Sequence, residues 1–331
     1  MNIRMRTAAT ALALSLAVTV AACGGDDSDA ASGDAGKSFT IGLQSPESLD
    51  IVPVRLALDE LTADGYSIEI AFFDSPDTLG QAMQSGDIDM GVVNAGTIFR
   101  SIDAGLDAKI FMALSATGYQ MMARKELTSC ASLDGKVLGI ESRESTTGSL
   151  AARWLKSSCP DAKPKLTVVP GSENRIAGML AGQIDASPID YQNSTVLLNQ
   201  ASDRFGVIEA FSDARELAAA VYATTDWLAA NKELVSSFVD AYITKIQEGY
   251  KDVNALAPKA AEVVPDLDPE VRKQVLDLWV ETHQWNPVSG VQPAYIERAI
   301  DLYGTATGYK NIKTADQVST TEFVAGQPAD L

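Results

Sequence analysis

The sequence predicts an α/β fold in which a mainly parallel sheet flanked by helices is built twice, and three observations lead to this prediction. Short apolar runs alternate with helical patterns from residue 37 onward. The alternation starts again after residues 119–124, and from residue 226 the pattern is helical. Strands that alternate with helical segments are typical of βαβ units, in which crossover helices join parallel strands.

The first unit is predicted from three short apolar runs, which we assign as strands at residues 39–43, 67–73 and 88–93. Apolar residues at helical spacing follow the first two strands. They are Val54, Leu58 and Leu61 in the first helix, and Leu79, Ala82 and Met83 in the second. Gly86 is a suitable C-terminal residue for the second helix, because glycine adopts the left-handed conformation that often ends a helix.

The second unit is predicted from two short internal matches. Residues 40–45 are similar to residues 137–142 at an offset of 97, and residues 86–89 are similar to residues 182–185 at an offset of 96. Two matches at nearly one offset indicate that the chain builds the same α/β unit twice.

The C-terminal third is predicted to be one strand, 218–225, followed by helices at 227–250, 255–264, 269–283 and 293–304. Asp268 before Pro269 is a strong helix start. We expect this helical segment to return to the first lobe and pack on it. The expected domains are therefore lobe 1 at residues 37–126 and 218–331, and lobe 2 at residues 127–217.

The N-terminal residues 1–22 have the pattern of a secretory signal peptide, with Arg4 and Arg6 before a short apolar run. Small residues precede Cys23, which indicates bacterial lipoprotein processing with a lipid on Cys23. Residues 23–36 are rich in Gly, Asp, Ser and Ala and predict a flexible tether. We expect a lipid-anchored protein on the outer face of the cell membrane; a chance cysteine is the alternative.

The charge and the cysteines narrow the class of protein. The formal net charge is −18, and removal of the two arginines of the signal takes it to −20, so nucleic acid is not an expected partner. Cys130 and Cys159 remain in the processed chain. In an oxidising compartment we predict a disulfide between them, with two unpaired buried thiols as the alternative.

Catalytic and metal sites lack the residues that they need. His283 is the only histidine, which excludes the usual multi-histidine metal sites. Neither a Gly-x-Ser-x-Gly nucleophile motif nor a Gly-x-Gly-x-x-Gly dinucleotide motif is present. We therefore expect a non-enzymatic binding protein without a metal or cofactor.

A binding site is expected beyond the carboxyl ends of the strands, where open α/β sheets bind ligands. The repeat places Asn94 on Asp190 and Gln44 on Glu141, so equivalent strand ends of the two units can face one another. The candidate ligand-binding residues lie at or beside these ends. They are Gln44, Ser45, Asn94, Thr97, Tyr119, Glu141, Ser142, Thr146, Thr147, Asp190 and Tyr191.

Each of these residues also has a purely structural interpretation. The hydroxyls of residues 142–147 precede a helix and could bind an anion, or they could only cap that helix. Tyr119 and Tyr191 could stack on a ring or could pack in the core. Arg143 could face a ligand or pair with Glu141 or Glu144.

Several motifs, in their order along residues 38–310, resemble substrate-binding proteins of ABC importers. The most similar branch serves nitrate, aliphatic sulfonates, taurine and thiamine pyrimidine precursors. The motifs are a lipoprotein signal, Thr40-Ile41-Gly42, the segment Leu79-Gly80-Gln81-Ala82-Met83-Gln84-Ser85-Gly86-Asp87-Ile88-Asp89-Met90-Gly91, Leu133-Asp134-Gly135-Lys136-Val137, and Trp227-Leu228-Ala229-Ala230-Asn231.

The resemblance implies a two-lobed type II periplasmic-binding-protein fold, a monomer that holds a small molecule between its lobes and delivers it to an ABC permease. Family ligand contacts carry over to Ser45, Asn94, Thr97, Thr146, Thr147 and Asp190. The ligand expected is a sulfonate, an amino-sulfonate or a pyrimidine-like compound. Glu141 and Asp190 add acid to this site, so a zwitterion with its anion at Thr146 and its amine at Asp190 would fit.

Two other functions are considered. A sensing lipoprotein could use the same fold to signal to a membrane partner. A pyrimidine synthase resembles this branch, but that enzyme needs histidine and a cysteine-rich motif, which this chain lacks.

Overall fold

The computed structural model describes residues 37–143, 145–211 and 216–324. Cys23, the predicted signal at 1–22 and the predicted tether at 23–36 lie outside the described residues. The described chain forms two mixed sheets flanked by helices, which confirms the α/β fold.

The first sheet has five strands in the order β2-β1-β3-β10-β4. Strand β10 runs antiparallel to its neighbours β3 and β4, and the pairs β1–β2 and β1–β3 are parallel. The strands are β1 Ser38–Gln44, β2 Ser67–Phe73, β3 Met90–Asn94, β4 Ala108–Ala116 and β10 Leu217–Thr224. We call the part of the molecule that carries this sheet lobe 1.

The second sheet, in lobe 2, repeats this arrangement in the order β7-β6-β8-β5-β9. Strand β5 is antiparallel to β8 and β9, and β6 is parallel to both β7 and β8. The strands are β5 Tyr119–Arg124, β6 Val137–Ile140, β7 Lys165–Val168, β8 Ala186–Asp190 and β9 Phe205–Ala210.

Matching side-chain contacts confirm the internal repeat. The backbone N–H of Thr40 donates to Asp89 Oδ2 at 2.8 Å, and that of Val137 donates to Asp185 Oδ2, also at 2.8 Å. The side chain of Asp89 thus binds β1, and β3 begins at Met90, two residues later than the predicted strand at 88–93.

Two glycines at equivalent positions allow close packing beneath each sheet. A Cβ atom added at Gly42 would lie 2.6 Å from Ile88 Cδ1, and one at Gly139 would lie 3.0 Å from Ile184 Cδ1. The isoleucine that precedes each aspartate therefore packs directly on the first strand of its unit, β1 or β6.

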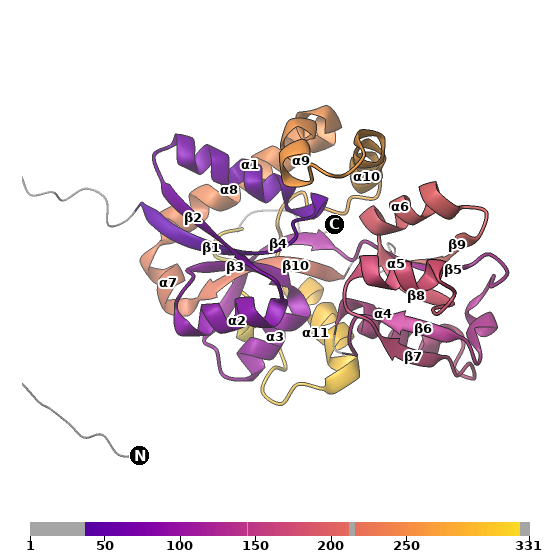
Figure 1. Ribbon diagram of the computed structural model, residues 1–331. Coiled ribbons are helices and arrows are strands. Elements are labelled where there is room, and N and C mark those ends of the chain that lie inside the picture. Colours follow the sequence, from indigo (N-terminus) through magenta and orange to yellow (C-terminus); the bar gives the residue numbers. More distant parts are fainter. Residues whose placement is uncertain (1–36, 144, 212–215, 325–331) are drawn as a thin grey trace, which may run out of the picture. The chain divides into compact units, whose positions relative to one another are not determined.

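Helices cover both faces of each sheet (Figure 1). In lobe 1, α1 lies on one face, and α2 and α3 lie on the other; in lobe 2, α4 lies on the face opposite α5 and α6. Their bounds are α1 Val52–Ala63, α2 Pro76–Ser85, α3 Ala95–Asp103, α4 Thr146–Ser158, α5 Ser172–Leu180 and α6 Tyr191–Ala201.

The C-terminal helices are α7 Thr225–Ala230, α8 Lys232–Lys251, α9 Ala257–Val263, α10 Pro269–Glu281 and α11 Pro293–Thr307. The prediction of a single helix at 227–250 was wrong. Asn231 leaves the helical conformation (φ −123°, ψ 32°), and its side chain donates to Trp227 O at 2.9 Å. Within the described ranges, no helix is both long and apolar enough to cross a membrane.

The helical segment returns to lobe 1 and also reaches lobe 2. Lys245 of α8 pairs with Glu60 of α1 at 2.9 Å, and Tyr242 donates to Leu114 O of β4 at 3.0 Å. Helices α10 and α11 contact α6 and α4 of lobe 2, respectively. The C-terminal segment therefore touches both lobes.

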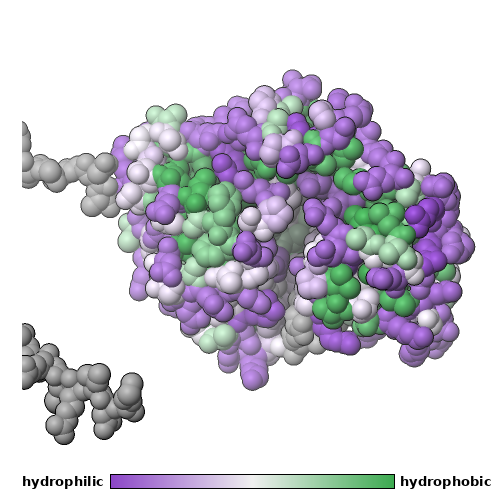
Figure 2. Space-filling model, in the orientation of Figure 1, coloured by the Kyte–Doolittle hydropathy of each residue, from purple (hydrophilic) through white to green (hydrophobic). Residues whose placement is uncertain are grey.

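The chain passes between the sheets twice, from β4 to β5 and from β9 to β10. Because β5 pairs with β8 and β9, the first passage lies at residues 117–118, ahead of the boundary at 126 that the sequence led us to expect. Figure 2 shows the molecular surface recessed between the two lobes.

Cys130 and Cys159 form a disulfide, as predicted, with their Cα atoms 5.8 Å apart. Cys130 begins the short helix η2 Cys130–Leu133, and Cys159 is the residue that ends α4. The cross-link holds the C-terminus of α4, whose N-terminus carries several candidate site residues.

Candidate functional site

Asn94 and Asp190 end equivalent strands and cap the helices that follow. Asn94 Oδ1 accepts a hydrogen bond from Thr97 N, and Asp190 Oδ1 accepts one from Asn193 N, each at 2.9 Å. Asn193 Nδ2 donates to both oxygens of the Asp190 carboxylate, at 3.2 and 3.0 Å. The caps fix both side chains at the edge of their sheets, where the sequence predicted them.

The remaining candidates of lobe 1 contact their own lobe. Thr97 is buried, and its hydroxyl accepts a hydrogen bond from Arg100 at 3.1 Å. Gln44 is paired with Phe73 in the sheet, and Ser45 N donates to Phe73 O at 2.8 Å. The hydroxyl of Thr97 is thus engaged within α3.

Hydroxyl groups in the loop before α4 bind mostly to the loop itself. Glu141 N donates to Thr147 Oγ1 at 2.9 Å, and Ser145 accepts from Gly148 N at 3.3 Å as the helix cap. Ser142 and Ser145 exchange backbone-to-side-chain hydrogen bonds at 3.2 and 3.0 Å. The capping interpretation therefore accounts for Ser145, whereas the hydroxyl of Thr147 binds the loop before the helix.

Thr146 contacts lobe 1 through Tyr303 of α11. The two hydroxyl oxygens lie 3.2 Å apart, and both side chains are buried. Tyr303 donates to Leu217 O at 3.1 Å, so Thr146 donates to Tyr303. Burial raises the pKa of Tyr303 to about 12, although the Thr146 hydrogen bond opposes this effect. The raised pKa keeps the phenol protonated near neutral pH.

Tyr303 also fills the space at the start of α3. A Cβ atom added at Gly96 would lie 2.6 Å from Tyr303 Cδ1. One buried aromatic side chain thus covers the N-termini of α3 and α4 together. These are the two helix starts at which an anion would be stabilised.

Tyr119, Asp190 and Tyr191 meet where the chain enters lobe 2. Tyr119 is paired with Asp190 in the sheet, and Tyr191 N donates to Gly118 O at 2.9 Å. Burial raises the pKa of Tyr119 well above its usual value, and the charges of Asp190 and Glu141 raise it further. The structure therefore brings these four candidates together.

Asp50 was missed by the sequence analysis. It lies in the short helix η1 Leu49–Ile51, and its carboxylate accepts a hydrogen bond from the Ser48 hydroxyl. Burial raises the pKa of Asp50, Ser48 opposes this effect, and the charge of Asp190 adds to it. The carboxylates of Asp50 in lobe 1 and Asp190 in lobe 2 therefore interact across the two lobes.

Arg175 of α5 was also missed. It is 1% exposed, and its guanidinium donates to Ser187 Oγ, Val169 O and Ser172 Oγ at 2.8 to 3.1 Å. Its charge lowers the pKa of Tyr119, which places it near the same corner of lobe 2. Its position in the first turn of a polar helix carried no signal that it would be buried.

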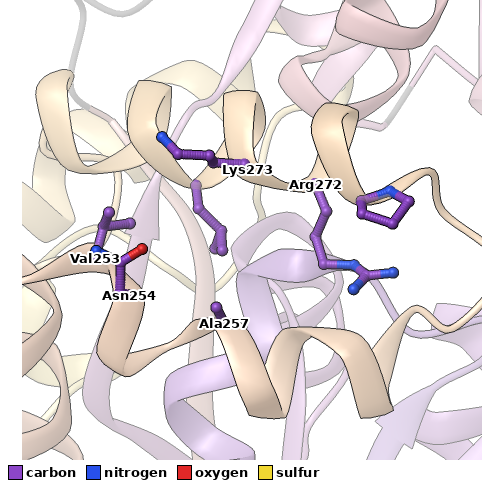
Figure 3. A pocket seen from close by; sticks show the side chains of 7 residues that line it. Val253, Asn254, Ala257, Arg272 and Lys273 are labelled. Atoms are coloured by element: carbon purple, nitrogen blue, oxygen red, sulfur yellow. The ribbon is translucent and has the colours of Figure 1, made fainter.

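A separate pocket of about 180 Å³ lies between α10 and the segment formed by η4 Val253–Ala255 and α9 (Figure 3). None of the candidate ligand-binding residues lines it. Its two cations have other contacts, because Arg272 donates to Leu267 O at 2.7 Å and Lys273 pairs with Asp277. Among the residues that the structure describes, no group of His, Cys, Asp and Glu side chains could hold a metal ion.

The matched family model covers more than half of the chain. The model described as "NMT1/THI5 like" matches residues 62–256, a range that includes all of the second sheet and most strands of the first. The chain belongs to the NMT1/THI5-like family. None of the curated proteins matches it significantly.

This NMT1/THI5-like chain shares its fold with several solved proteins of low sequence identity. The alkanesulfonate-binding protein SsuA from Xanthomonas axonopodis pv. citri, bound to MOPS, is 20% identical with a TM-score of 0.67, over 85% of this chain and 98% of that chain. The periplasmic nitrate-binding protein NrtA from Synechocystis PCC 6803 is 12% identical with a TM-score of 0.66, over 87% of each chain.

A ligand-binding component of an ABC-type import system from Staphylococcus aureus, with zinc bound, has a TM-score of 0.69 at 15% identity, over 87% of this chain and 98% of that chain. These likenesses confirm the two-lobed periplasmic-binding-protein fold of the NMT1/THI5-like chain.

Proposed function

We propose that this protein captures a small organic molecule between its two lobes, on the outer side of the cell membrane, and delivers it to an ABC permease. The observation that carries the proposal is the contact between the two lobes beside the candidate strand ends, where Leu49 N of lobe 1 donates to Gln192 Oε1 of lobe 2 at 3.1 Å and the hydroxyls of Thr146 and Tyr303 lie 3.2 Å apart. The solved proteins of the same fold support it, because they include binding proteins for alkanesulfonate and nitrate and a component of an ABC importer.

The proposal includes an anchor and no catalytic step. A lipid on Cys23 would hold the binding protein near its permease through the tether at residues 23–36. We propose a monomer with the predicted lobes, at residues 37–126 and 218–331 and at residues 127–217, except that the first boundary moves from residue 126 to residues 117–118 because β5 belongs to the second sheet. No cofactor is required for capture and release.

The first experiment is a thermal-shift screen of the chain from residue 24 onward against sulfonates, amino-sulfonates, pyrimidines, aromatic acids and amines. A compound that binds only the folded state raises the melting temperature. We expect at least one compound to do so, and we expect a strain that lacks the gene to lose uptake of that compound.

Restored uptake with the wild-type gene would support delivery to a permease. A Cys23→Ser variant should leave the membrane fraction and restore less uptake. If no compound stabilises the chain, or if the deletion strain takes up the stabilising compound normally, the transport function is wrong. Loss of a transcriptional response with unchanged uptake would favour the sensing lipoprotein instead.

A further inference from the structure

Four contacts tie Asp50 and Asp190 into one corner between the lobes. Leu49 N donates to Gln192 Oε1 at 3.1 Å, and Trp285 Nε1 donates to the carbonyl oxygen of Asp50 at 3.0 Å. The side chain of Gln284 lies against Gly118, whose carbonyl accepts from Tyr191 N. Residues beside Asp50 thus contact residues beside Asp190 directly, and the neighbouring residues Gln284 and Trp285 contact both groups.

This corner is rich in carboxylates that no basic side chain neutralises. Within the described part of the chain, Asp50, Glu141 and Asp190 form no ion pair. The nearby guanidinium of Arg175 binds uncharged oxygens of its own lobe. Burial raises the pKa of Asp50 and the charge of Asp190 adds to this effect, and a cation between these two carboxylates would relieve the repulsion.

Gln284 is an independent observation that points to a ligand with N–H groups. The residue is 1% exposed, and its Oε1 is buried without a hydrogen-bond partner among the described residues. A Cβ atom at Gly118 would lie 2.9 Å from this oxygen and 3.4 Å from Tyr191 Cδ2. The unpartnered acceptor therefore lies beside the residues that flank Tyr119 and Asp190. A buried acceptor of this kind is costly unless a donor reaches it.

The positions that would stabilise an anion are covered by the protein itself. Tyr303 packs on Gly96 at the start of α3, and its hydroxyl binds Thr146 at the start of α4. The hydroxyl of Thr147 binds Glu141 N, and that of Thr97 binds Arg100. Protein side chains thus occupy these helix starts, whereas Gln284 Oε1 is a buried acceptor without a hydrogen-bond partner among the described residues.

We infer that the site between the lobes binds the protonated amine of a small organic cation, with Asp50, Glu141 and Asp190 supplying negative charge and Gln284 Oε1 accepting an N–H. This inference rests on the proposed function, because it names the ligand class of the same site. It replaces the prediction of a zwitterionic ligand whose anionic group lies at Thr146, because the hydroxyl of Tyr303 contacts Thr146.

The test uses matched probes that differ only in their charged group. The probes are benzylamine, benzyltrimethylammonium and phenylmethanesulfonate, with propylamine and propane-1-sulfonate as an aliphatic pair. Thermal shift and calorimetry are measured on the chain from residue 24 onward. We expect the amines to stabilise the protein, the trimethylammonium probe to bind more weakly because it has no N–H, and the sulfonates to have no effect.

Two variants locate the effect without removing the fold. Asp190→Asn keeps an effective helix cap while it removes the charge, and Gln284→Met keeps the volume while it removes the acceptor. Each should weaken amine binding by about tenfold or more. Asp277→Asn changes a carboxylate on α10 that pairs with Lys273, and it should leave amine binding unchanged.

The outcomes separate the two proposals. Stabilisation by a sulfonate and not by its matching amine overturns the cation inference and leaves the solute-binding function in place. Stabilisation by no probe and by no compound of the wider screen overturns both. Amine binding that is unchanged in both Asp190→Asn and Gln284→Met would also overturn the inference.

Discussion

The disulfide between Cys130 and Cys159 should contribute measurably to stability. The bond closes a loop with a sequence separation of 29 residues. The loop-entropy relation then gives about 3.6 kcal/mol of stabilisation at 25 °C. With an unfolding entropy of about 0.6 kcal/mol/K for a chain of about 300 residues, this energy corresponds to a shift of about 6 °C in melting temperature.

The perturbation is reduction of the wild-type chain, compared with a Cys130→Ala/Cys159→Ala double variant. Both cysteines are largely buried and lie at η2 and at the end of α4, so the double variant also loses some packing. Reduction removes the cross-link alone, and it should lower the melting temperature of the wild type without effect on the double variant. Thiol titration after unfolding should detect two thiols only in the reduced wild-type chain from residue 24 onward. Equal unfolding curves for the oxidised and reduced wild type would refute this reasoning.

Three further predictions concern single side chains. Burial opposes a lower pKa for Asp103, but hydrogen bonds from the backbone N–H groups of residues 310–312 lower this pKa below 3.8. The contribution of Asp103 to the free energy of unfolding is therefore present above pH 3.8 and is lost as the pH falls through the lowered pKa. Asp103→Ala should cost about 1 kcal/mol at neutral pH and should reduce the fall in stability that urea titrations measure at acidic pH; an unchanged fall would contradict this prediction. Tyr303→Phe should lower the free energy of unfolding by about 1 to 3 kcal/mol through its lost hydrogen bonds, and its effect should not add to that of Thr146→Val; additive losses would show that the two hydroxyls do not interact. Asn94→Ala should cost about 1 kcal/mol as a lost helix cap, whereas Asn94→Asp should cost much less; equal losses in denaturation midpoints would argue against capping.

The sequence predicted the features that depend on local pattern. Short apolar runs and helical spacings located most strands and helices. The two short matches predicted that Asp89 and Asp185 would be equivalent, which their hydrogen bonds to Thr40 and Val137 confirm. The same alignment predicted that Asn94 and Asp190 would be equivalent, and the structure shows that each of them caps a helix.

The residues that were missed reach the site only through tertiary packing. Asp50 lies in a short helix outside any strand, Gln284 follows the end of α10, and Tyr303 belongs to the last long helix. Their positions depend on the return of the C-terminal segment across both lobes, and no local periodicity reports such a contact. The helix break at Asn231 had a weak local signal, because Asn has a lower helix propensity than its neighbours Ala230 and Lys232, but a propensity difference of this size does not end a helix by itself.

The most direct test of the account is a crystal structure of the chain with the amine that stabilises it best. We predict that the ammonium nitrogen lies between the lobes, within hydrogen-bond distance of Gln284 Oε1 or of the carboxylate of Asp190 or Asp50. A ligand bound in the pocket between α9 and α10, or one whose anionic group displaces Tyr303 from Thr146, would contradict it.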